Sequence, residues 1–218
     1  MRKIQRLWVG LGVLSLIWLG GGCVHQKELE NAHIEALANP NNGPAVRVLK
    51  VTDLRKFEAD PQNIQTPTVV NSDEIANRAV TLRAIGKGEN AGYTFYYTYP
   101  EGRTVETEVQ TVVENALRTK GYFVVANDSP SAASAIPVTV EIRKSWFWFV
   151  TGVWTMTLQY DVVVDVTSPI VLNGGTESAA GHFDITSPFM VDRVCENCIC
   201  DGLDDLRDKL LPKLKKPG

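Results

Sequence analysis

Cysteines are the residues of this chain whose spacing most suggests chemistry, because three of the four lie close together in one segment. They occur in Cys-Glu-Asn-Cys-Ile-Cys at residues 195–200. A Cys-x-x-Cys pair exchanges electrons when a helix N-terminus or a nearby cation lowers the pKa of its thiol. Here Glu196 and Asp201 oppose ionisation of the thiols, and no strand–helix–strand unit of the thioredoxin kind precedes the motif. Redox catalysis is therefore only the third of our functional hypotheses.

The same three thiols could instead hold a metal ion or form a disulfide. A zinc site needs four ligands, so Cys195, Cys198 and Cys200 would require a further ligand such as His182. An oxidising compartment disfavours such a site and favours disulfides. We therefore expect a structural disulfide that joins Cys195 to Cys198 or to Cys200, with one thiol left over, and we expect no metal and no cofactor. Free thiols are the alternative.

The fourth cysteine, Cys23, follows a segment typical of a bacterial export signal. Residues 1–6 carry three basic side chains and no acid, and residues 7–19 form an apolar stretch too short to span a bilayer comfortably. Leu19 and three glycines then precede Cys23. Small residues directly before a cysteine resemble the bacterial lipobox, although the leucine stands four positions before the cysteine where that motif prefers three.

Lipidation of Cys23 is what this resemblance implies. Residues 1–22 would be a lipoprotein signal peptide, and acyl chains on Cys23 would anchor the protein because each buried methylene contributes about 0.8 kcal/mol. Val24 stands where an aspartate would resemble a retention signal for the inner membrane. We therefore expect a lipid-anchored protein of the bacterial outer membrane that faces the periplasm. An ordinary cleaved secretory signal with an incidental cysteine is the alternative.

The net charge argues against one large class of partner. The 218 residues carry a formal net charge of −3, and removing the three basic residues of the export signal leaves 19 basic and 25 acidic side chains, a net charge of −6. The sequence has no basic stripe with interleaved aromatic residues. Nucleic acid is therefore not an expected partner. The hydrophobic content of 44% is that of an ordinary globular protein.

The remaining polar residues do not form a recognisable catalytic motif. His182 and Asp184 share one side of a predicted strand, but no nucleophile motif accompanies them, so we expect an exposed strand pair. The glycine-rich residues 86–92 lead into a strand and lack the Gly-Lys-Ser/Thr ending of a phosphate-binding loop, so we expect a flexible loop there. Gly-x-Ser-x-Gly and His-Glu-x-x-His do not occur. We therefore expect no enzymatic activity.

Two long strands and two helices must position these residues. Apolar and polar side chains alternate over residues 136–166, with a break at residues 151–152, which predicts a long central hairpin with one buried face. Apolar residues at helical spacing predict helices over 104–120 and 201–215. These elements predict an α+β fold of two layers, in which both helices pack on one face of an antiparallel-rich mixed sheet. Shorter strands are expected at residues 45–52, 93–99, 122–126 and 179–185.

The chain after the signal divides into a tether and one domain. Residues 23–44 begin with the lipidated cysteine and end in Asn-Pro-Asn-Asn-Gly-Pro, which interrupts regular structure, so we expect a tether that lets the domain stand off the membrane. Residues 45–218 are expected to form a single α+β domain. Within it, residues 54–70 contain two prolines and little periodicity, which predicts a long loop.

An aromatic run near the hairpin turn is the candidate interaction surface. Trp146, Trp148 and Trp154 fall on the apolar face of the alternation, but Phe147 and Phe149 fall on the face expected to be polar. An exposed apolar patch of this kind indicates contact with a partner or a membrane. The alternative is that a helix or the long loop covers that face.

Three segments in this order resemble the YajG-type family of bacterial lipoproteins. They are Val-Thr-Asp-Leu-Arg-Lys-Phe at 51–57, the stretch from Ile85-Gly86 through Pro-Glu-Gly-Arg-Thr-Val at 100–105 to Ala-Leu-Arg-Thr-Lys-Gly-Tyr at 116–122, and Val-Glu-Ile at 140–142 before Trp-Phe-Trp at 146–148. The resemblance covers most of residues 45–215 and implies a fold related to the small α/β domains of envelope proteins such as the TolB N-terminal domain. It implies no activity, and the cysteine-rich segment lies outside it.

The leading hypothesis is a non-enzymatic outer-membrane lipoprotein whose periplasmic domain is a binding or assembly module of the cell envelope. Its expected partners are the membrane, through the N-terminal lipid anchor, and another envelope protein. The rival hypothesis is an auxiliary lipoprotein of a transport system, which would hold a lipid or small ligand in an apolar cleft between the sheet and the helices.

Overall fold

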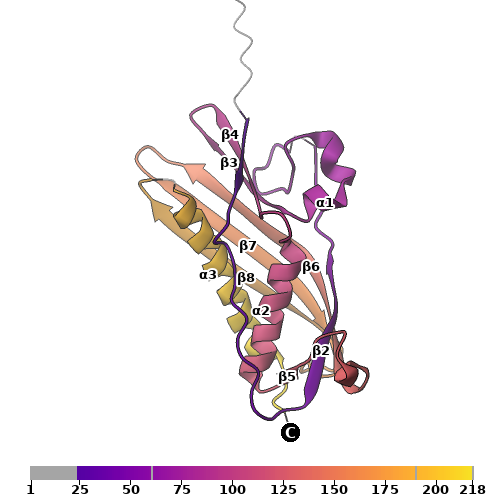
Figure 1. Cartoon of the computed structure of the whole chain (residues 1–218). Coiled ribbons are helices and arrows are strands. Elements are labelled where there is room, and N and C mark those ends of the chain that lie inside the picture. The colour runs from indigo at the N-terminus through magenta and orange to yellow at the C-terminus, as the bar shows by residue number, and fades with distance from the viewer. Residues whose placement is uncertain (1–23, 60, 190, 218) are drawn as a thin grey trace, which may run out of the picture.

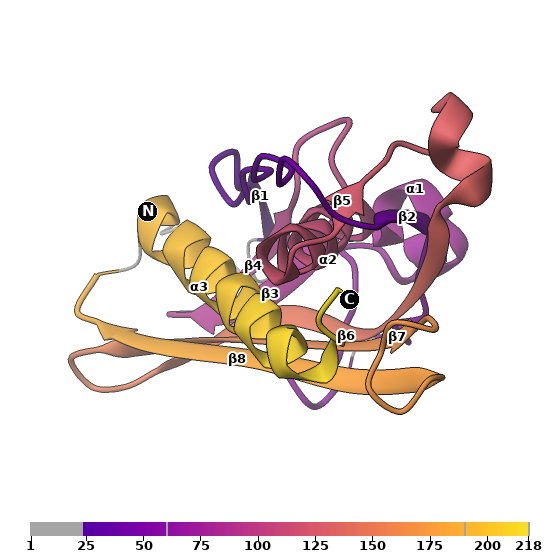
Figure 2. The ribbon, with the colours of Figure 1, turned by 90° about the horizontal axis from the view of Figure 1, so that it is seen from below.

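The computed structural model describes residues 24–59, 61–189 and 191–217, which form an α+β domain. A mixed sheet of eight strands packs against two long helices, α2 (Val105–Lys120) and α3 (Asp192–Leu210), which lie on the same face (Figure 1 and Figure 2). This arrangement confirms the predicted fold class. The predicted signal peptide and Cys23 lie outside the described residues. In the described part of the chain, no helix is both long enough and apolar enough to cross a membrane.

Strand β6 (Ile136–Thr151) is the centre of the sheet. One edge of β6 pairs antiparallel with β7 (Met156–Thr167), and β7 pairs antiparallel with β8 (Thr176–Ser187). The other edge of β6 is divided between two parallel neighbours, β2 (Ala45–Asp53) along its first half and β3 (Ala84–Asn90) along its second half. The remaining strands extend these two branches, and they are β1 (Val24–Glu28), β4 (Tyr93–Thr98) and β5 (Phe123–Val124).

A β-bulge at Arg143 changes the faces of β6. Ile142 pairs with Val164, and Lys144 pairs with Val163, so the bulged strand contains one residue more than its partner. Because successive side chains point to opposite faces, this extra residue reverses the alternation for the rest of the strand. Before the bulge the even-numbered residues face the helices, and after it the odd-numbered residues do.

The bulge buries the aromatic run of β6 on both faces of the sheet. Phe147 and Phe149 join the main core beneath the helices, whereas Trp146 and Trp148 form a second apolar cluster on the opposite face. All four side chains are buried. The prediction that these four form an exposed interaction surface is therefore wrong. The helices and the long loop of residues 54–70 cover them, as in the alternative interpretation. Trp154, the fifth predicted member, lies in the turn after β6 and is exposed.

The long loop predicted for residues 54–70 is present and explains the second cluster. Its described residues, 54–59 and 61–70, contain no regular secondary structure, and the loop passes over the face of β6 that carries the tryptophans. Trp146 Nε1 donates a hydrogen bond of 3.1 Å to the carbonyl oxygen of Ile64, and the ring of Phe57 packs edge-on against Trp146. The loop is continued by a 3-10 turn (Ser72–Ala76) and the short helix α1 (Arg78–Thr81).

Helix α2 begins and ends where its local sequence indicates. Thr104 caps it, since its side chain accepts a hydrogen bond from the backbone of Thr107, whose own hydroxyl accepts one in return from the backbone of Thr104. Gly121 ends it in the left-handed conformation at φ 102°, which glycine adopts without steric cost. The predicted helix over 104–120 is therefore confirmed.

Helix α3 is longer at its start than predicted. It begins at Asp192, nine residues before the expected start at Asp201, so the cysteine-rich segment is helical. It ends at Leu210 and passes into a 3-10 turn (Leu211–Lys213) that contains Pro212, in agreement with the expected stop. A third 3-10 turn, Pro130–Ser134, precedes β6.

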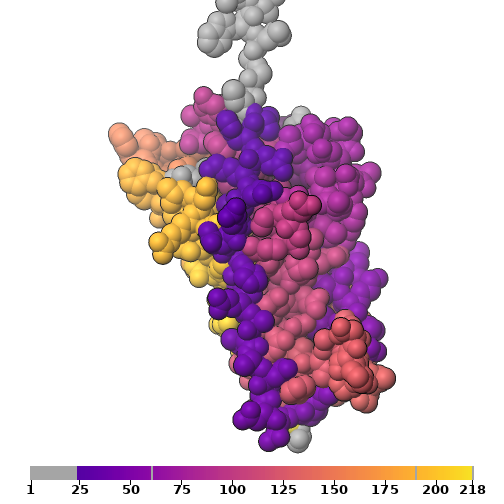
Figure 3. Space-filling model, viewed as in Figure 1, coloured from indigo at the N-terminus to yellow at the C-terminus, as the bar shows by residue number. Residues whose placement is uncertain are grey.

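The segment predicted as a tether is part of the folded domain. Its first described residues, Val24–Glu28, form β1, which pairs parallel with β4. The remainder, residues 29–44, which we call the strap, runs along the groove between α2 and α3 (Figure 3). Leu29 and Ala32 of the strap have no exposed surface. The interpretation of residues 24–44 as a flexible spacer is therefore wrong.

Polar side chains of the helices hold the strap in place. Glu196 accepts a hydrogen bond of 2.9 Å from the backbone of Asn31, and Glu108 accepts one of 3.1 Å from the backbone of Ile34. Farther along, Asn115 Oδ1 accepts a hydrogen bond of 2.8 Å from the backbone of Leu37, and Asn115 Nδ2 donates one of 2.7 Å to the carbonyl oxygen of Glu35. A segment without regular structure obtains its hydrogen bonds in this way, which the sequence pattern does not reveal.

The glycine-rich segment predicted as a flexible loop is mostly strand β3. A side chain at Gly86 would place its Cβ 2.5 Å from the carbonyl oxygen of Phe147, and one at Gly88 would lie 1.6 Å from the ring of Phe149. The glycines therefore let β3 run beside β6 beneath the two phenylalanine rings. Only Ala91 and Gly92 form the turn to β4, both at positive φ.

Candidate functional site

Helix α3 carries the three clustered cysteines as free thiols. Cys195 and Cys198 are fully buried, and Cys200 is half-buried with its sulfur 3.7 Å from the carbonyl oxygen of His33. Side chains three positions apart on a helix keep their Cβ atoms about 5–6 Å apart, which exceeds the separation of a disulfide. Cys200 points toward the strap, away from the other two. The predicted disulfide among these residues is therefore not formed.

Burial also suppresses the reactivity of these thiols. It raises the pKa of Cys195 and of Cys198 to about 12, so both are protonated at neutral pH. His182, the expected fourth ligand of a metal site, does not approach them. Phe183 packs on the helix side of β8 and its neighbour His182 therefore points to the other face. The structure does not bring the thiols and the imidazole together.

His182 belongs to an ionic cluster on the face of β6, β7 and β8 that points away from the helices, which we call the open face. Asp161 accepts a hydrogen bond of 2.6 Å from His182 Nδ1 and another of 2.6 Å from Lys144 Nζ. Partial burial alone would raise the pKa of Asp161, but these two hydrogen bonds hold it below its ordinary value. Asp184 Oδ1 lies 3.6 Å from His182 Nε2 and is exposed. The cluster is a set of cross-strand ion pairs on an exposed surface.

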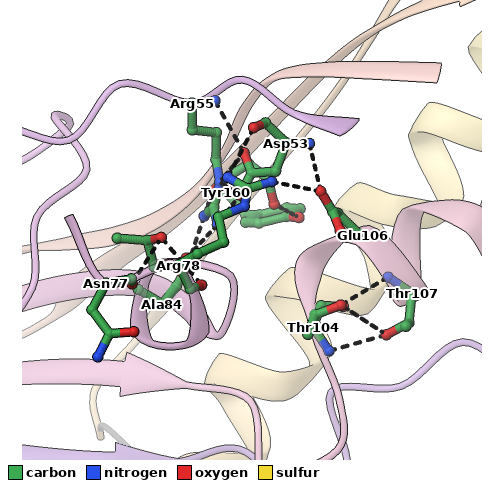
Figure 4. Close-up of polar contacts among 11 residues, drawn as sticks. Asp53, Arg55, Asn77, Arg78, Ala84, Thr104, Glu106, Thr107 and Tyr160 are labelled. Atoms are coloured by element: carbon green, nitrogen blue, oxygen red, sulfur yellow. Dashed lines mark hydrogen bonds and ion pairs between the residues drawn. The ribbon is translucent and has the colours of Figure 1, made fainter. Parts of the chain in front are cut away.

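A buried arginine closes the place where the two branches of the sheet separate (Figure 4). The Arg55 side chain has no exposed surface and pairs with Asp53 at 2.8 Å. Its guanidinium also donates hydrogen bonds of 2.8 Å to the carbonyl oxygen of Thr81, 2.6 Å to that of Ala84 and 2.9 Å to that of Ser145. One side chain thus satisfies the main chain of α1, β3 and β6 at the gap between β2 and β3, where that edge of β6 has no paired strand.

The surrounding charges extend this buried node to helix α2. Glu106 accepts a hydrogen bond of 2.8 Å from the backbone of Asp53 and one of 2.6 Å from Arg78. Arg78 donates a second hydrogen bond, of 3.0 Å, to the carbonyl oxygen of Asp53 (Figure 4). Every partner here belongs to the protein's own framework, so we interpret the node as a structural one.

The pocket under the long loop is small for a ligand. A pocket of about 100 Å³ lies under the long loop, near Val69, Val80 and Tyr97, whereas pockets for small molecules commonly measure about 300–1,000 Å³. Between the helices and the sheet, where the rival hypothesis places an apolar cleft, core side chains occupy the space. They include Val109, Val113, Leu117, Leu203 and Leu206, each at most 2% exposed.

The clearest surface feature is a concentration of apolar side chains at one end of the molecule. Among the described residues, twelve large apolar side chains are exposed, and seven of them lie at this end. Val153 and Trp154 are each 87% exposed, and Phe189 is 73% exposed. Exposed apolar groups that gather in this way mark contact with a partner or a membrane. We call this group the apolar end, and its members are Val24, Tyr93, Val150, Val153, Trp154, Phe189 and Val191.

Three loops converge to form the apolar end (Figure 1). They are the turn between β3 and β4, the turn between β6 and β7, and the connection from β8 to α3. Thr151 Oγ1 donates a hydrogen bond of 3.0 Å to the carbonyl oxygen of Glu89, which joins the first two turns. Asn90, Trp154 and Pro188 line one shallow hollow, which places the third loop beside them.

The first described strand starts at the same end. Val24 pairs with Thr94, next to the turn between β3 and β4, and the ring of His25 lies 5.6 Å from that of Tyr93. The nearby charges are paired, with Lys27 2.7 Å from Asp192. The apolar end therefore begins at the residue that directly follows Cys23 in the chain.

Sequence reasoning identified only Trp154 of this surface. The other members lie in or beside turns, where polar residues and glycine are usual. An available signal was the occurrence of Val153 and Phe189 at such positions, each close to a glycine or proline. Their convergence depends on the pairing of β3 with β6, which the sequence pattern did not predict.

No family model matches the chain, and no curated protein matches it. Solved structures with some similarity include the crystal structure of a protein from Xanthomonas campestris assigned to the family model DUF330, at 7% identity and a TM-score of 0.40, covering 86% of this chain and 91% of that one. Another is the crystal structure of an uncharacterized protein, at 6% identity and a TM-score of 0.39, covering 87% of this chain and 97% of that one. The resemblance to YajG-type lipoproteins stays a prediction from the sequence.

Proposed function

We propose that the protein is a non-enzymatic lipoprotein of the bacterial outer membrane, anchored by acyl chains on Cys23, whose periplasmic domain is a binding or assembly module of the cell envelope. The observation that carries the proposal is the position of Val24, which begins β1 at the apolar end. Cys23, which lies outside the described residues, directly precedes Val24 in the chain. The predicted lipid attachment therefore directly precedes, in the sequence, the strand that starts among the exposed apolar side chains.

The docked strap gives this anchor a mechanical consequence. With β1 in the sheet and the strap bonded to both helices, the domain has no spacer that would let it move away from the acylated residue. A domain attached in this manner has a fixed orientation, with the apolar end toward the membrane and the opposite end of β6 away from it. Fixed orientation suits a module that assembles with other envelope components.

The open face is the surface that we assign to a protein partner. It stays uncovered along β7 and β8, and its side chains are held by contacts between neighbouring strands. Arg143 pairs with Asp165 at 2.8 Å, and Thr157 and Thr186 share a hydrogen bond of 3.2 Å. A preorganised polar surface suits a non-obligate interface, in which polar and apolar area are mixed. This surface replaces the buried aromatic run as the candidate site.

The anchor is tested by the intact mass of the full chain purified from bacterial membranes. We expect a protein that begins at Cys23 and carries acyl chains, and a Cys23→Ala variant that leaves the membrane fraction. An unmodified Cys23 would refute the lipoprotein assignment.

The partner surface is tested by a photo-crosslinking amino acid at Ala180, which is exposed on the open face. In intact cells we expect one protein adduct of defined mass, and we expect Arg143→Glu to abolish it. A crosslinker at Thr119, exposed on α2, is the matched control. Equal adducts from both positions, or none from Ala180, would remove the open face as the binding surface.

A further inference from the structure

We propose that the apolar end docks on a phospholipid bilayer and places Trp154, Val153 and Phe189 in its interfacial region. The inference rests on the proposed function, because it assumes that Cys23 is acylated. It adds that the lipid anchor is not the only contact with the membrane. The folded domain itself then lies against the lipid surface through side chains from three loops.

The position of the anchor argues for this occupant. The acyl chains must enter the bilayer, and the chain between them and the folded domain has no free residue, since Val24 is already paired in the sheet. The backbone N–H of Leu29 donates a hydrogen bond of 3.0 Å to the carbonyl oxygen of Thr98. Strand β1 therefore continues into the packed strap without a hinge. The surface next to Val24 must therefore face the lipid headgroups at close range.

The side chains at this surface are those that favour such a location. Tryptophan and tyrosine concentrate at membrane interfaces because their rings are apolar and carry one polar group. Trp154 and Tyr93 supply such rings, and Phe189, Val153 and Val191 add apolar area without a polar group. The most exposed of them come from turns that extend beyond the sheet, where they can enter the interface without a change of fold (Figure 1).

The charges at the apolar end do not oppose this contact. Lys87 pairs with Glu89 at 2.9 Å, and Lys27 pairs with Asp192 at 2.7 Å. Paired charges reduce the cost of bringing a surface close to lipid, because neither partner loses all of its electrostatic stabilisation when water is displaced.

The test uses the full chain purified from bacterial membranes and placed in vesicles of phosphatidylethanolamine and phosphatidylglycerol that contain dibrominated phosphatidylcholine. Bromine quenches tryptophan fluorescence on contact. Trp146 and Trp148 are buried within the domain and Trp154 is exposed, so the difference between the chain and its Trp154→Phe variant isolates one reporter. We expect roughly two-fold quenching of the Trp154 emission, as for a ring at the membrane interface.

Two double variants test whether the quenching of Trp154 depends on the apolar end. Val153→Ser with Phe189→Ser keeps the Trp154 reporter and should reduce its quenching. Leu49→Ser with Leu172→Ser changes two exposed apolar residues elsewhere, at the other end of the β6–β7 hairpin, and should leave the quenching unchanged. Equal quenching in both pairs would overturn the inference.

The outcomes separate the inference from the proposed function. If mass spectrometry shows acylated Cys23 while Trp154 is not quenched, the anchor stands and the docking of the domain is overturned. If Cys23 is unmodified, both are overturned. A photo-crosslinker at position 154 that yields a protein adduct in place of lipid would assign the apolar end to a protein and also overturn the inference.

Discussion

The hairpin of β6 and β7 contains two aromatic regions that are similar in sequence and opposite in environment. Residues 146–149 of β6 are enclosed from both sides of the sheet, whereas Trp154, in the turn that follows, is 87% exposed. The first region has neighbours on every side, namely the helices, the long loop and the glycines of β3. The second extends beyond them. Aromatic content therefore does not distinguish a stabilising core from a contact surface.

Trp146→Ala tests the buried region and should have the largest effect on stability. Removing a buried tryptophan loses apolar contacts and leaves a cavity, so the free energy of unfolding should fall by about 3–5 kcal/mol. Trp154→Ala is the matched control, and its effect should stay within about 0.5 kcal/mol because the side chain is exposed. Urea denaturation of both variants measures the difference. Similar losses of unfolding free energy in both variants would mean that the turn is packed as tightly as the strand. The two aromatic regions would then not differ in environment.

Arg55→Ala extends the same contrast from apolar to charged side chains. It leaves the Asp53 carboxylate buried without its partner and three carbonyl oxygens without their donor, so the free energy of unfolding should fall by about 3 kcal/mol. Arg143→Ala removes an arginine from exposed ion pairs and should change stability little. Thermal unfolding compares the two. An Arg55 variant as stable as the Arg143 variant would contradict the role of the buried node.

The thiols of α3 provide the smallest and most gradual effect, which depends on pH. Burial raises the pKa of Cys195 and Cys198 from 9.0 to about 12, so ionisation favours the unfolded state once the pH exceeds the ordinary thiol pKa. Their contribution is complete below about pH 9 and declines as the pH rises above it.

Urea titrations at increasing pH should show this alkaline decline, and a variant with alanine at positions 195 and 198 should show less of it. Below the ordinary thiol pKa, both thiols of the folded protein should resist alkylation and react only after unfolding. Rapid labelling of the native protein at both positions would show that the helix does not bury them.

Local signals predicted the elements whose boundaries depend on neighbouring residues. Thr104 and Gly121 define helix α2 because capping bonds and a left-handed residue act within one turn of the helix. Pro212 ends α3 near the predicted position because proline lacks the amide hydrogen that a helix needs. The alternation over residues 136–166 likewise predicted the central hairpin, since each strand shows its buried face directly in its pattern.

The candidate surfaces were harder to predict from the sequence. Only Trp154 of the predicted aromatic surface is exposed. The bulge at Arg143 turns Phe147 and Phe149 toward the helices, and the long loop covers Trp146 and Trp148 on the other face. A bulge depends on how two strands pair and leaves no regular mark in either of them. The prediction of a disulfide was wrong for a similar reason. Helix α3 starts at Asp192, before the apolar stripe that predicted it, and the helical conformation keeps the thiols apart.

The sequence by itself determined the class of fold, the capped helix, the central hairpin and the expectation of an acylated Cys23, because each depends on residues close together in the chain. Only the tertiary structure decided that residues 24–44 are docked and that three turns join Val24 at one apolar end. The physical reason is that the strap has no periodicity of its own. Its hydrogen bonds come from Glu108, Asn115 and Glu196, which lie far from it in sequence.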